Sequence, residues 1–321
     1  MNRAARAIAH SNIALSKYWG KRPDAYNSPA VPSLSVTLEG LATHTRVEFR
    51  DDIDADRLVV NGREERGRGI ERAAALLDGL RREAGITARA SIDSVNDFPT
   101  ASGLASSASG FAALAVAAVG AAGVDWDLAR TSELARLGST SASRSVFGGF
   151  VELDAGASRA HPLFPRDHLP LVVLVCVADE GPKAVASHDG MRITMQKSPY
   201  ARAWLEEAPR LHARLRDALR ARDFAGVGEL AEASALAMHA SAMAAGIVYW
   251  NAVTLDALAT VRALRAEGTL VYATMDAGPH VKVLVRPEDV AHVRPRMAAS
   301  RGVVRIIEAK PGGNAELVPS S

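Results

Sequence analysis

A run of small residues, PTASGLASSASG at positions 99–110, leads directly into an alanine-rich segment of helix-forming composition. The N-terminus of a helix carries unpaired N–H groups and about half a positive charge, so it attracts anions. Gly103 lets the backbone approach a phosphate closely, and the hydroxyls of Ser106, Ser107 and Ser109 can donate to phosphate oxygens or hold a metal ion. The run therefore predicts a phosphate-binding loop. The alternative is a linker in front of a buried helix.

Two lysines, Lys17 and Lys21, lie four positions apart in SKYWGK. The chain has 38 basic residues, of which only six are lysines. A lysine supplies a compact, strongly hydrated charge, so this pair favours a contact with a carboxylate or a phosphate. Two solvated surface lysines are the alternative. Tyr18 and Trp19, which lie between them, are predicted to belong to the core or to a pocket wall.

Arg144 is surrounded by four serines, Ser139, Ser141, Ser143 and Ser145, in a polar segment ahead of an expected strand. A guanidinium group binds a carboxylate through two parallel hydrogen bonds, and serine hydroxyls can bind a phosphate beside it. The segment therefore predicts an anion-binding turn, with an ordinary surface turn as the alternative.

Asp276 lies in ATMDAGPH, between an expected strand and a turn. A carboxylate in this place can be aimed into a cleft and accept a proton, although many such aspartates only cap a turn. The nine histidines show no HxxxH or HExxH spacing, which argues against a dedicated zinc site. His239 is expected to pack inside a helix.

Composition limits the class of protein. The chain has 321 residues, 48% of them hydrophobic and 23% charged, which indicates a folded protein of two domains. A net charge of +2 with scattered signs provides no basic face for nucleic acid. The single cysteine, Cys176, lies in an apolar run and is expected in the core, which fits a reducing compartment. No secretory signal is evident, and the uncharged stretch 98–124 is too weakly apolar for a confident membrane span, so we expect a cytoplasmic protein.

Strands and helices alternate along the chain, which predicts an α/β or α+β fold. A β-sheet opens the chain, Asn61-Gly62 is a strong hairpin signal, and residues 314–321 read as a frayed end. Near residue 168 the composition changes, and we place a domain boundary there, giving domains 1–168 and 169–321. The other expected elements are a helix over 69–84, a strand over 88–99, a helix from 111, a helix over 126–138, a strand over 171–178, helices from roughly 192 to 265, two strands within 269–285, and a helix and a strand within 290–311.

The order of residues in the predicted phosphate loop resembles the phosphate loop of the GHMP kinases. The residues that carry this resemblance are Pro99, Gly103, Leu104, Ser106, Ser107 and Ala108. Over residues 10 to about 285 the chain is similar to the mevalonate diphosphate decarboxylases, which are relatives of these kinases. This resemblance rests on NIALSKYWGK, SLSVTL, NDFPTASGLASSASGFAAL, GSTSASRSVFGGF, ASHDGM with the following SP, and MDAGP, which occur in the same order and at similar spacings.

The resemblance implies an α+β, two-domain GHMP kinase fold, in which each domain is a mainly antiparallel sheet covered by helices and the active site lies in the cleft between them. It implies the conversion of mevalonate 5-diphosphate to isopentenyl diphosphate, ADP, phosphate and CO₂, with ATP and Mg²⁺ as cofactors. It also implies a homodimer.

The resemblance further implies roles for single residues. Asp276 contacts the C3 hydroxyl of the substrate, Lys17 lies at the reacting centre, and Arg144 holds the substrate carboxylate. Tyr18, Lys21 and Ser141 are expected at the substrate diphosphate. The residues expected around the ATP phosphates are Pro99, Gly103, Leu104, Ala105, Ser106, Ser107, Ala108 and Ser187, with Ser107 as the candidate contact to Mg²⁺.

Four residues, at three places in the chain, depart from the family pattern. Val31-Pro32 stands where Asn-Ser is usual, Ser16 replaces an apolar residue, and His188 stands where some members have arginine. Because these changes cluster around the phosphate end of the substrate, phosphomevalonate decarboxylase is the main alternative. A mevalonate 3-kinase and a non-catalytic nucleotide-binding relative are the others.

Overall fold

Two long antiparallel strands, β1 (Ala4–Ser16) and β2 (Ser33–Arg50), form the centre of the fold. The computed structural model describes residues 4–22, 28–98, 106–178, 181 and 185–319, and every structural statement below refers to these residues. From Thr43 onward β2 alternates between buried and more exposed side chains, as expected of a sheet that is covered on one face. The first part of β2 is buried at successive positions, because other elements cover both of its faces there.

The other strands of the N-terminal half extend this pair along the edge of β2 that lies opposite β1. β3 (Arg57–Val60), β4 (Arg63–Glu64) and β5 (Arg89–Asn96) continue the sheet from residues 43–50 of β2, and β6 (Phe150–Leu153) and β7 (His161–Phe164) continue it from residues 33–36. Asn61 and Gly62 join β3 to β4 with positive φ angles of 49° and 75°, so the predicted hairpin is confirmed.

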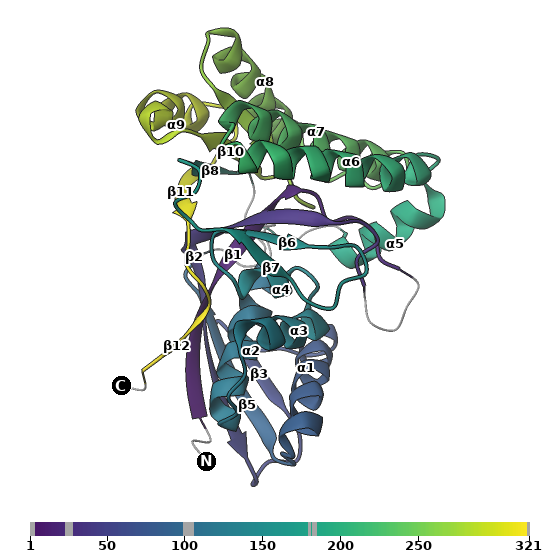
Figure 1. The fold of residues 1–321 in the computed structure, drawn as a ribbon, viewed down its shortest axis with the longest axis vertical. Helices are drawn as coiled ribbons and strands as arrows, with labels where there is room; N and C mark the ends of the chain where they lie inside the picture. The colour runs from purple at the N-terminus through teal and green to yellow at the C-terminus, as the bar shows by residue number, and fades with distance from the viewer. Residues whose placement is uncertain (1–3, 23–27, 99–105, 179–180, 182–184, 320–321) are drawn as a thin grey trace.

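Four helices cover one face of this sheet: α1 (Arg68–Ala84), α2 (Ser106–Ala122), α3 (Leu128–Gly138) and the short α4 (Ala142–Ser145) (Figure 1). α2 is buried along almost its whole length, since its alanines and glycines let the sheet and the neighbouring helices approach closely. No described helix is long and apolar enough to cross a membrane.

The C-terminal half has a sheet of its own with a helical layer. Strands β8 (Val172–Val177), β9 (Val271–Thr274), β10 (Val281–Val285) and β11 (Arg305–Pro311) pair in the order β11-β8-β10-β9, all antiparallel. The helical elements are α5 (Ser187–Lys197), α6 (Ala201–Arg220), α7 (Phe224–Met243), α8 (Ala252–Ala266), the 3₁₀ turn η1 (Pro287–Asp289) and α9 (Val290–Ala298).

β11 connects the two halves. Its first five residues pair with β8, and its last two, Lys310 and Pro311, pair with β2. One hydrophobic cluster also crosses the junction, where Leu15 and Val36 pack with Leu215 of α6 and Val173 of β8. The elements that carry the predicted site residues are therefore held against one another by backbone hydrogen bonds and by a shared core.

Most of the expected elements are present, and the fold is α+β with a mostly antiparallel sheet. Three expectations were wrong. The helix expected from residue 111 begins at Ser106, and the helical region expected from about 192 begins at Ser187. The expected frayed end contains β12 (Glu316–Val318), which pairs with β1 across the sheet.

Candidate active site

A cavity of about 670 Å³ lies where the N-terminal helices meet the end of β1 and the segments after β8 and β9. It brings together residues that the sequence places far apart, from Asn12 to Ala277. The predicted site residues that line it are Lys17, Tyr18, Lys21, Ser106, Ser107, Ser141, Arg144, Ser187 and Asp276. Pro99, Gly103, Leu104 and Ala105 lie outside the described residues.

Asp276 is held by two lysines. Lys17 Nζ lies 2.8 Å from Asp276 Oδ1, and Lys282 Nζ lies 3.3 Å from Oδ2. Both lysine side chains are buried, with 2% and 1% of their surface exposed, whereas the Asp276 side chain keeps 23%. The carboxylate is therefore the most exposed part of this cluster.

The backbone around this cluster is fixed by hydrogen bonds. Lys17 follows β1, its N–H donates to Ser234 Oγ at 2.9 Å, and its ammonium also donates to the carbonyl oxygen of Ala14 at 2.7 Å. Asp276 follows β9, and its carbonyl oxygen accepts a hydrogen bond from the N–H of Gly278 at 2.8 Å, which closes the turn. Both side chains thus project from the ends of strands, which position a reactive group more rigidly than a free loop does.

Burial and charge set the ionisation of this cluster. Burial disfavours the charged form of Asp276, but Lys17 and Lys282 outweigh it and hold the pKa of this carboxyl well below its usual range. For Lys17 burial is the larger effect, so its pKa falls to about 8 although Asp276 opposes the change. The ionised pair is thus maintained near neutral pH, with Lys17 close to its titration range.

Arg144 is buried with neutral partners. Its Nη1 donates to Ser33 Oγ at 2.8 Å, its Nε donates to Ser35 Oγ at 3.1 Å, and its Nη2 lies 3.4 Å from Asn12 Oδ1. Among the described residues no carboxylate forms an ion pair with this guanidinium. Burial lowers the pKa of Arg144 to about 10, which still leaves it charged near neutral pH. A buried cation without a counter-ion favours the binding of an anion.

The four serines around Arg144 divide into two pairs. Ser139 and Ser141 line the cavity and lie 3.1 Å apart at their hydroxyl oxygens. Ser143 and Ser145 are fully buried, where Ser143 donates to the carbonyl oxygen of Thr140 and Ser145 accepts from Asn12. The expectation that serines of this segment face a phosphate can therefore apply to the first pair alone.

Two helix N-termini contribute hydroxyls to the cavity, from Ser106 and Ser107 in the first turn of α2 and from Ser187 in the first turn of α5. The prediction that Ser109 can reach a phosphate was wrong. Ser109 lies on the opposite face of α2 from Ser107 and hydrogen-bonds to Thr43 Oγ1 at 2.7 Å inside the protein. Ala108 is likewise fully buried in the N-terminal core, so its side chain does not line the cavity.

The other end of the cavity is basic. Lys21 Nζ lies 3.0 Å from His188 Nδ1, and Arg68 and Arg72 of α1 line the same region. Burial, followed by the two arginines, lowers the pKa of Lys21 to about 8. Burial and then Lys21 also lower the pKa of His188, which favours a neutral ring that accepts a hydrogen bond from the lysine. This end of the cavity suits a multiply charged anion.

Asn12, Arg72 and Lys282 are among the residues of this region that sequence reasoning missed. Lys282 carried a signal, since it is one of six lysines in the chain and interrupts the apolar run VKVLV. Arg72 and Asn12 carried none, because an arginine in a helix and an asparagine in a strand are ordinary surface residues until tertiary contacts are known.

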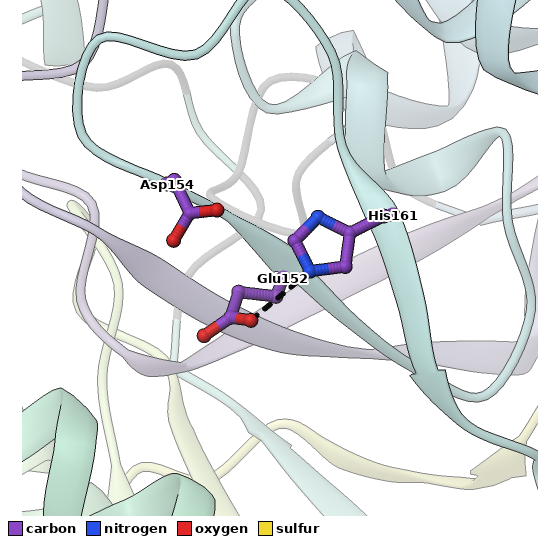
Figure 2. Close-up of side chains that lie close together, drawn as sticks. All are labelled: Glu152, Asp154 and His161. Carbon is purple, nitrogen blue, oxygen red and sulfur yellow. Dashed lines mark hydrogen bonds and ion pairs between the residues drawn. The ribbon is translucent and has the colours of Figure 1, made fainter.

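A second polar cluster lies outside the cavity, on β6 and β7. Figure 2 shows Glu152 of β6 facing His161 of β7, with Asp154 beside them, and these three residues could together offer ligands to a metal ion. The Glu152 carboxylate already has cationic or polar neighbours, with His212 Nε2 at 2.5 Å, His161 Nε2 at 3.1 Å and Arg216 Nη1 at 3.6 Å. These contacts identify Glu152 as the centre of a structural network that ties α6 to the sheet.

Comparison with known proteins agrees with this geometry. Residues 9–163 match the family model of the diphosphomevalonate decarboxylase-like N-terminal domain, and residues 173–305 match that of the mevalonate 5-diphosphate decarboxylase C-terminal domain. Human diphosphomevalonate decarboxylase is 36% identical, with 90% of this chain and 78% of the human protein covered. Phosphomevalonate decarboxylase of Haloferax volcanii is also 36% identical, with 92% of each chain covered.

A solved complex of MDDEF with MVAPP, AMPPCP and magnesium superposes with a TM-score of 0.91 at 36% identity and covers 99% of both chains. This likeness extends over both halves of the fold and over the region of the cavity. The chain therefore belongs to the diphosphomevalonate decarboxylase family.

Proposed function

We propose that this protein catalyses the ATP-dependent decarboxylation of mevalonate 5-diphosphate to isopentenyl diphosphate, with release of ADP, phosphate and CO₂. The observation that carries the proposal is the buried guanidinium of Arg144, which lacks an ion pair among the described residues and lies in the same cavity as the Lys17 and Asp276 pair. A substrate carboxylate would supply the missing negative charge and bring the neighbouring carbon atoms to Asp276.

The chemistry follows from the charges. The γ-phosphoryl group of ATP passes to the C3 hydroxyl, which turns a poor leaving group into phosphate. Departure of that phosphate leaves positive character at C3, and loss of CO₂ returns the electron pair that forms the double bond. Asp276 would orient the hydroxyl and tolerate the positive charge at C3, while Lys17 would stabilise the transferring phosphoryl group.

The phosphates of ATP fit the two helix N-termini. Ser106, Ser107 and Ser187 line the cavity at the N-termini of α2 and α5, so hydroxyls and the positive ends of two helices are available to phosphates there. Magnesium, when bound, would neutralise phosphate charge, and the exposed hydroxyl of Ser107 is the candidate protein ligand. The MDDEF complex, which is named for MVAPP, AMPPCP and magnesium, supports this set of ligands.

The substrate diphosphate fits the basic end of the cavity. We assign Tyr18, Lys21 and Ser141 to it, because all three line the same cavity as Arg144, Arg68 and Arg72. With this assignment the carboxylate end of the substrate lies at Arg144 and its phosphate end at Lys21.

Phosphomevalonate decarboxylase is the second candidate, favoured by the equally similar Haloferax relative. Of the positions that depart from the family pattern, only His188 lines the cavity. Val31 is fully buried, and Ser16 is buried with its hydroxyl 2.9 Å from His212 Nδ1. The case for the monophosphate therefore depends on His188, which offers a neutral ring where an arginine would offer a charge.

One assay separates these candidates. ADP and CO₂ release are followed with mevalonate, its 5-phosphate and its 5-diphosphate at equal concentrations of ATP and Mg²⁺. We expect the highest kcat/KM with the diphosphate and equal amounts of ADP and CO₂. If kcat/KM is at least tenfold higher with the monophosphate, which is about 1.4 kcal/mol of transition-state preference, the substrate assignment is overturned while the family assignment stands.

The family resemblance supports three further proposals. The first is a division of the chain into domains 1–168 and 169–321. The second is a homodimer, which sedimentation equilibrium would test. The third is a cytoplasmic location, which agrees with a single cysteine, Cys176, that is buried in β8 and therefore needs no oxidising compartment.

A further inference from the structure

Lys282 is a charged residue in a place that ordinarily excludes charge. It lies in β10, where all five residues are buried, and its side chain exposes only 1% of its surface. An ammonium group in such surroundings is costly unless it is paired and hydrogen-bonded. Its burial therefore needs a reason in the structure around it.

The register of the sheet supplies that reason. Lys282 is directly opposite Thr274 of β9, and Asp276 follows two residues later, after β9 has ended. The lysine can thus extend along the sheet to the carboxylate, and its Nζ lies 3.3 Å from Asp276 Oδ2. Lys282 does not line the cavity, whereas Asp276 and Lys17 do.

The two lysines approach different oxygen atoms of one carboxylate. Lys17 comes from the end of β1 to Oδ1, and Lys282 comes from β10 to Oδ2. Two such contacts restrict rotation of the carboxyl group about its last bond more than a single contact would. The cavity thus presents a carboxylate whose orientation is set from the protein side.

Four titratable or charged groups lie around Asp276, each on a different element or at its end. Besides Lys17 and Lys282, these groups are Arg144 of α4 and His239 of α7. Burial lowers the pKa of His239 to about 3, so this histidine is neutral near pH 7. The two lysines therefore act together to keep Asp276 ionised, and of these only Lys282 has no predicted contact with a ligand.

We propose that Lys282 is a positioning residue, which holds Asp276 from behind the cavity so that the carboxylate stays ionised and correctly turned toward the C3 hydroxyl of the substrate. This inference rests on the proposed function for the identity of the group that Asp276 meets. Lys282 itself touches neither substrate nor ATP.

The main test replaces Lys282 by methionine, which has a similar length and no charge. We expect kcat to fall about 10-fold to 100-fold, while the KM for ATP changes less than twofold. Loss of one cation raises the pKa of Asp276, so the acidic limb of the pH profile of kcat/KM should move to higher pH. Lys282→Arg should recover part of kcat, and Lys310→Met, at an exposed lysine of β11, should behave as wild type.

A second measurement does not depend on turnover. With ¹³C-labelled aspartate, the Asp276 carboxyl resonance is assigned by its absence from the Asp276→Asn protein, and its titration is compared in wild type and in Lys282→Met. Lys282→Gln serves for both measurements should the methionine variant not fold. We expect the carboxyl to titrate at higher pH in the uncharged variant.

The two ideas fail in different ways. An unchanged acidic limb together with an unchanged Asp276 titration would overturn the role of Lys282, even with a fully active wild-type enzyme. A wild-type protein that releases neither ADP nor CO₂ would instead overturn the proposed function. Even if the wild type were inactive, a higher Asp276 titration in Lys282→Met than in wild type would still support the contact by which Lys282 keeps the carboxylate ionised.

Discussion

Lys17 and Asp276 are 259 positions apart in the chain, yet Nζ of the first lies 2.8 Å from Oδ1 of the second. The contact joins the end of β1 to the segment after β9, and therefore the N-terminal half to the C-terminal half. Both residues line the cavity. The packing of the two halves against each other therefore also brings together the two groups that the proposed reaction needs.

The first prediction concerns the pH dependence of activity. The pKa of Lys17 is lowered to about 8, so the lysine loses its charge as the pH rises above this value. We expect kcat/KM, which reports the free enzyme, to fall above about pH 8. A profile that stays flat to about pH 10 would contradict a catalytic charge on Lys17.

Lys21 has the same lowered pKa and needs a control. Lys21→Arg keeps a positive charge at all pH values studied, since arginine does not lose its proton in this range. If Lys17 causes the alkaline fall, that fall persists in Lys21→Arg. If the alkaline fall of kcat/KM is absent from Lys21→Arg, its cause is the titration of Lys21 at the phosphate end of the substrate.

The second prediction concerns Arg144→Gln. The substitution removes the buried guanidinium. We expect kcat/KM for the phosphorylated substrate to fall at least about 30-fold, which corresponds to about 2 kcal/mol of transition-state stabilisation. The melting temperature should change little or rise, because the substitution also removes a buried charge without an ion pair among the described residues. A large loss of stability with unchanged substrate binding would make Arg144 a structural residue only.

The third prediction compares two serines of one helix. Ser107 lies at the cavity, whereas Ser109 is buried against Thr43 and Ser11. Ser107→Ala should raise the KM for ATP or lower kcat and leave the melting temperature unchanged. Ser109→Ala should destabilise the protein by about 1–3 kcal/mol and leave ATP kinetics unchanged. Equal ATP kinetics in both variants would exclude the first turn of α2 from the nucleotide site.

The fourth prediction concerns stability at low pH. Burial opposes ionisation of Glu152, but hydrogen bonds from His161 and His212 outweigh it and lower its pKa to about 2. A lowered carboxyl pKa stabilises the folded state above the unfolded value near 4.5, and this stabilisation is lost as the pH falls toward 2. The effect is at most on the order of 3 kcal/mol.

Glu152→Gln tests this assignment. The variant should unfold more easily than wild type at pH 7, and the difference between the two should shrink as the pH falls from about 5 to about 2. Chemical denaturation at a series of pH values would measure it. A difference that is constant over this range would show that the charge of Glu152 is not the source of its stabilisation.

The sequence predicted much of the site because its residues lie in short motifs. Lys17, Arg144 and Asp276 each stand beside a strand or turn that local patterns indicate, and the family resemblance joined them before any contact was known. Lys282 was not predicted as a site residue, because its role depends on the register of β10 against β9, which no local pattern reveals. Ser109 was misplaced because it was expected in a loop ahead of the helix, whereas α2 begins at Ser106 and directs this serine toward Thr43 inside the protein.

Long-range strand pairing was also hidden. β12 pairs with β1, and β11 pairs with both β2 and β8, so the last part of the chain stabilises strands formed by its beginning. A three-residue strand such as Glu316–Val318 has no periodicity of its own, and its polar surroundings resemble a frayed end.

Asp276→Asn tests the central claim most directly. Asparagine keeps the size and the hydrogen bonding of the side chain but removes the charge that Lys17 and Lys282 hold. Because two buried lysines lose their counter-ion, we expect a lower melting temperature, so turnover is measured well below it with saturating ATP and mevalonate 5-diphosphate. We expect kcat for ADP release to fall about 10²-fold to 10⁴-fold while both substrates still bind. A folded Asp276→Asn protein with near-normal kcat would contradict the catalytic role of Asp276.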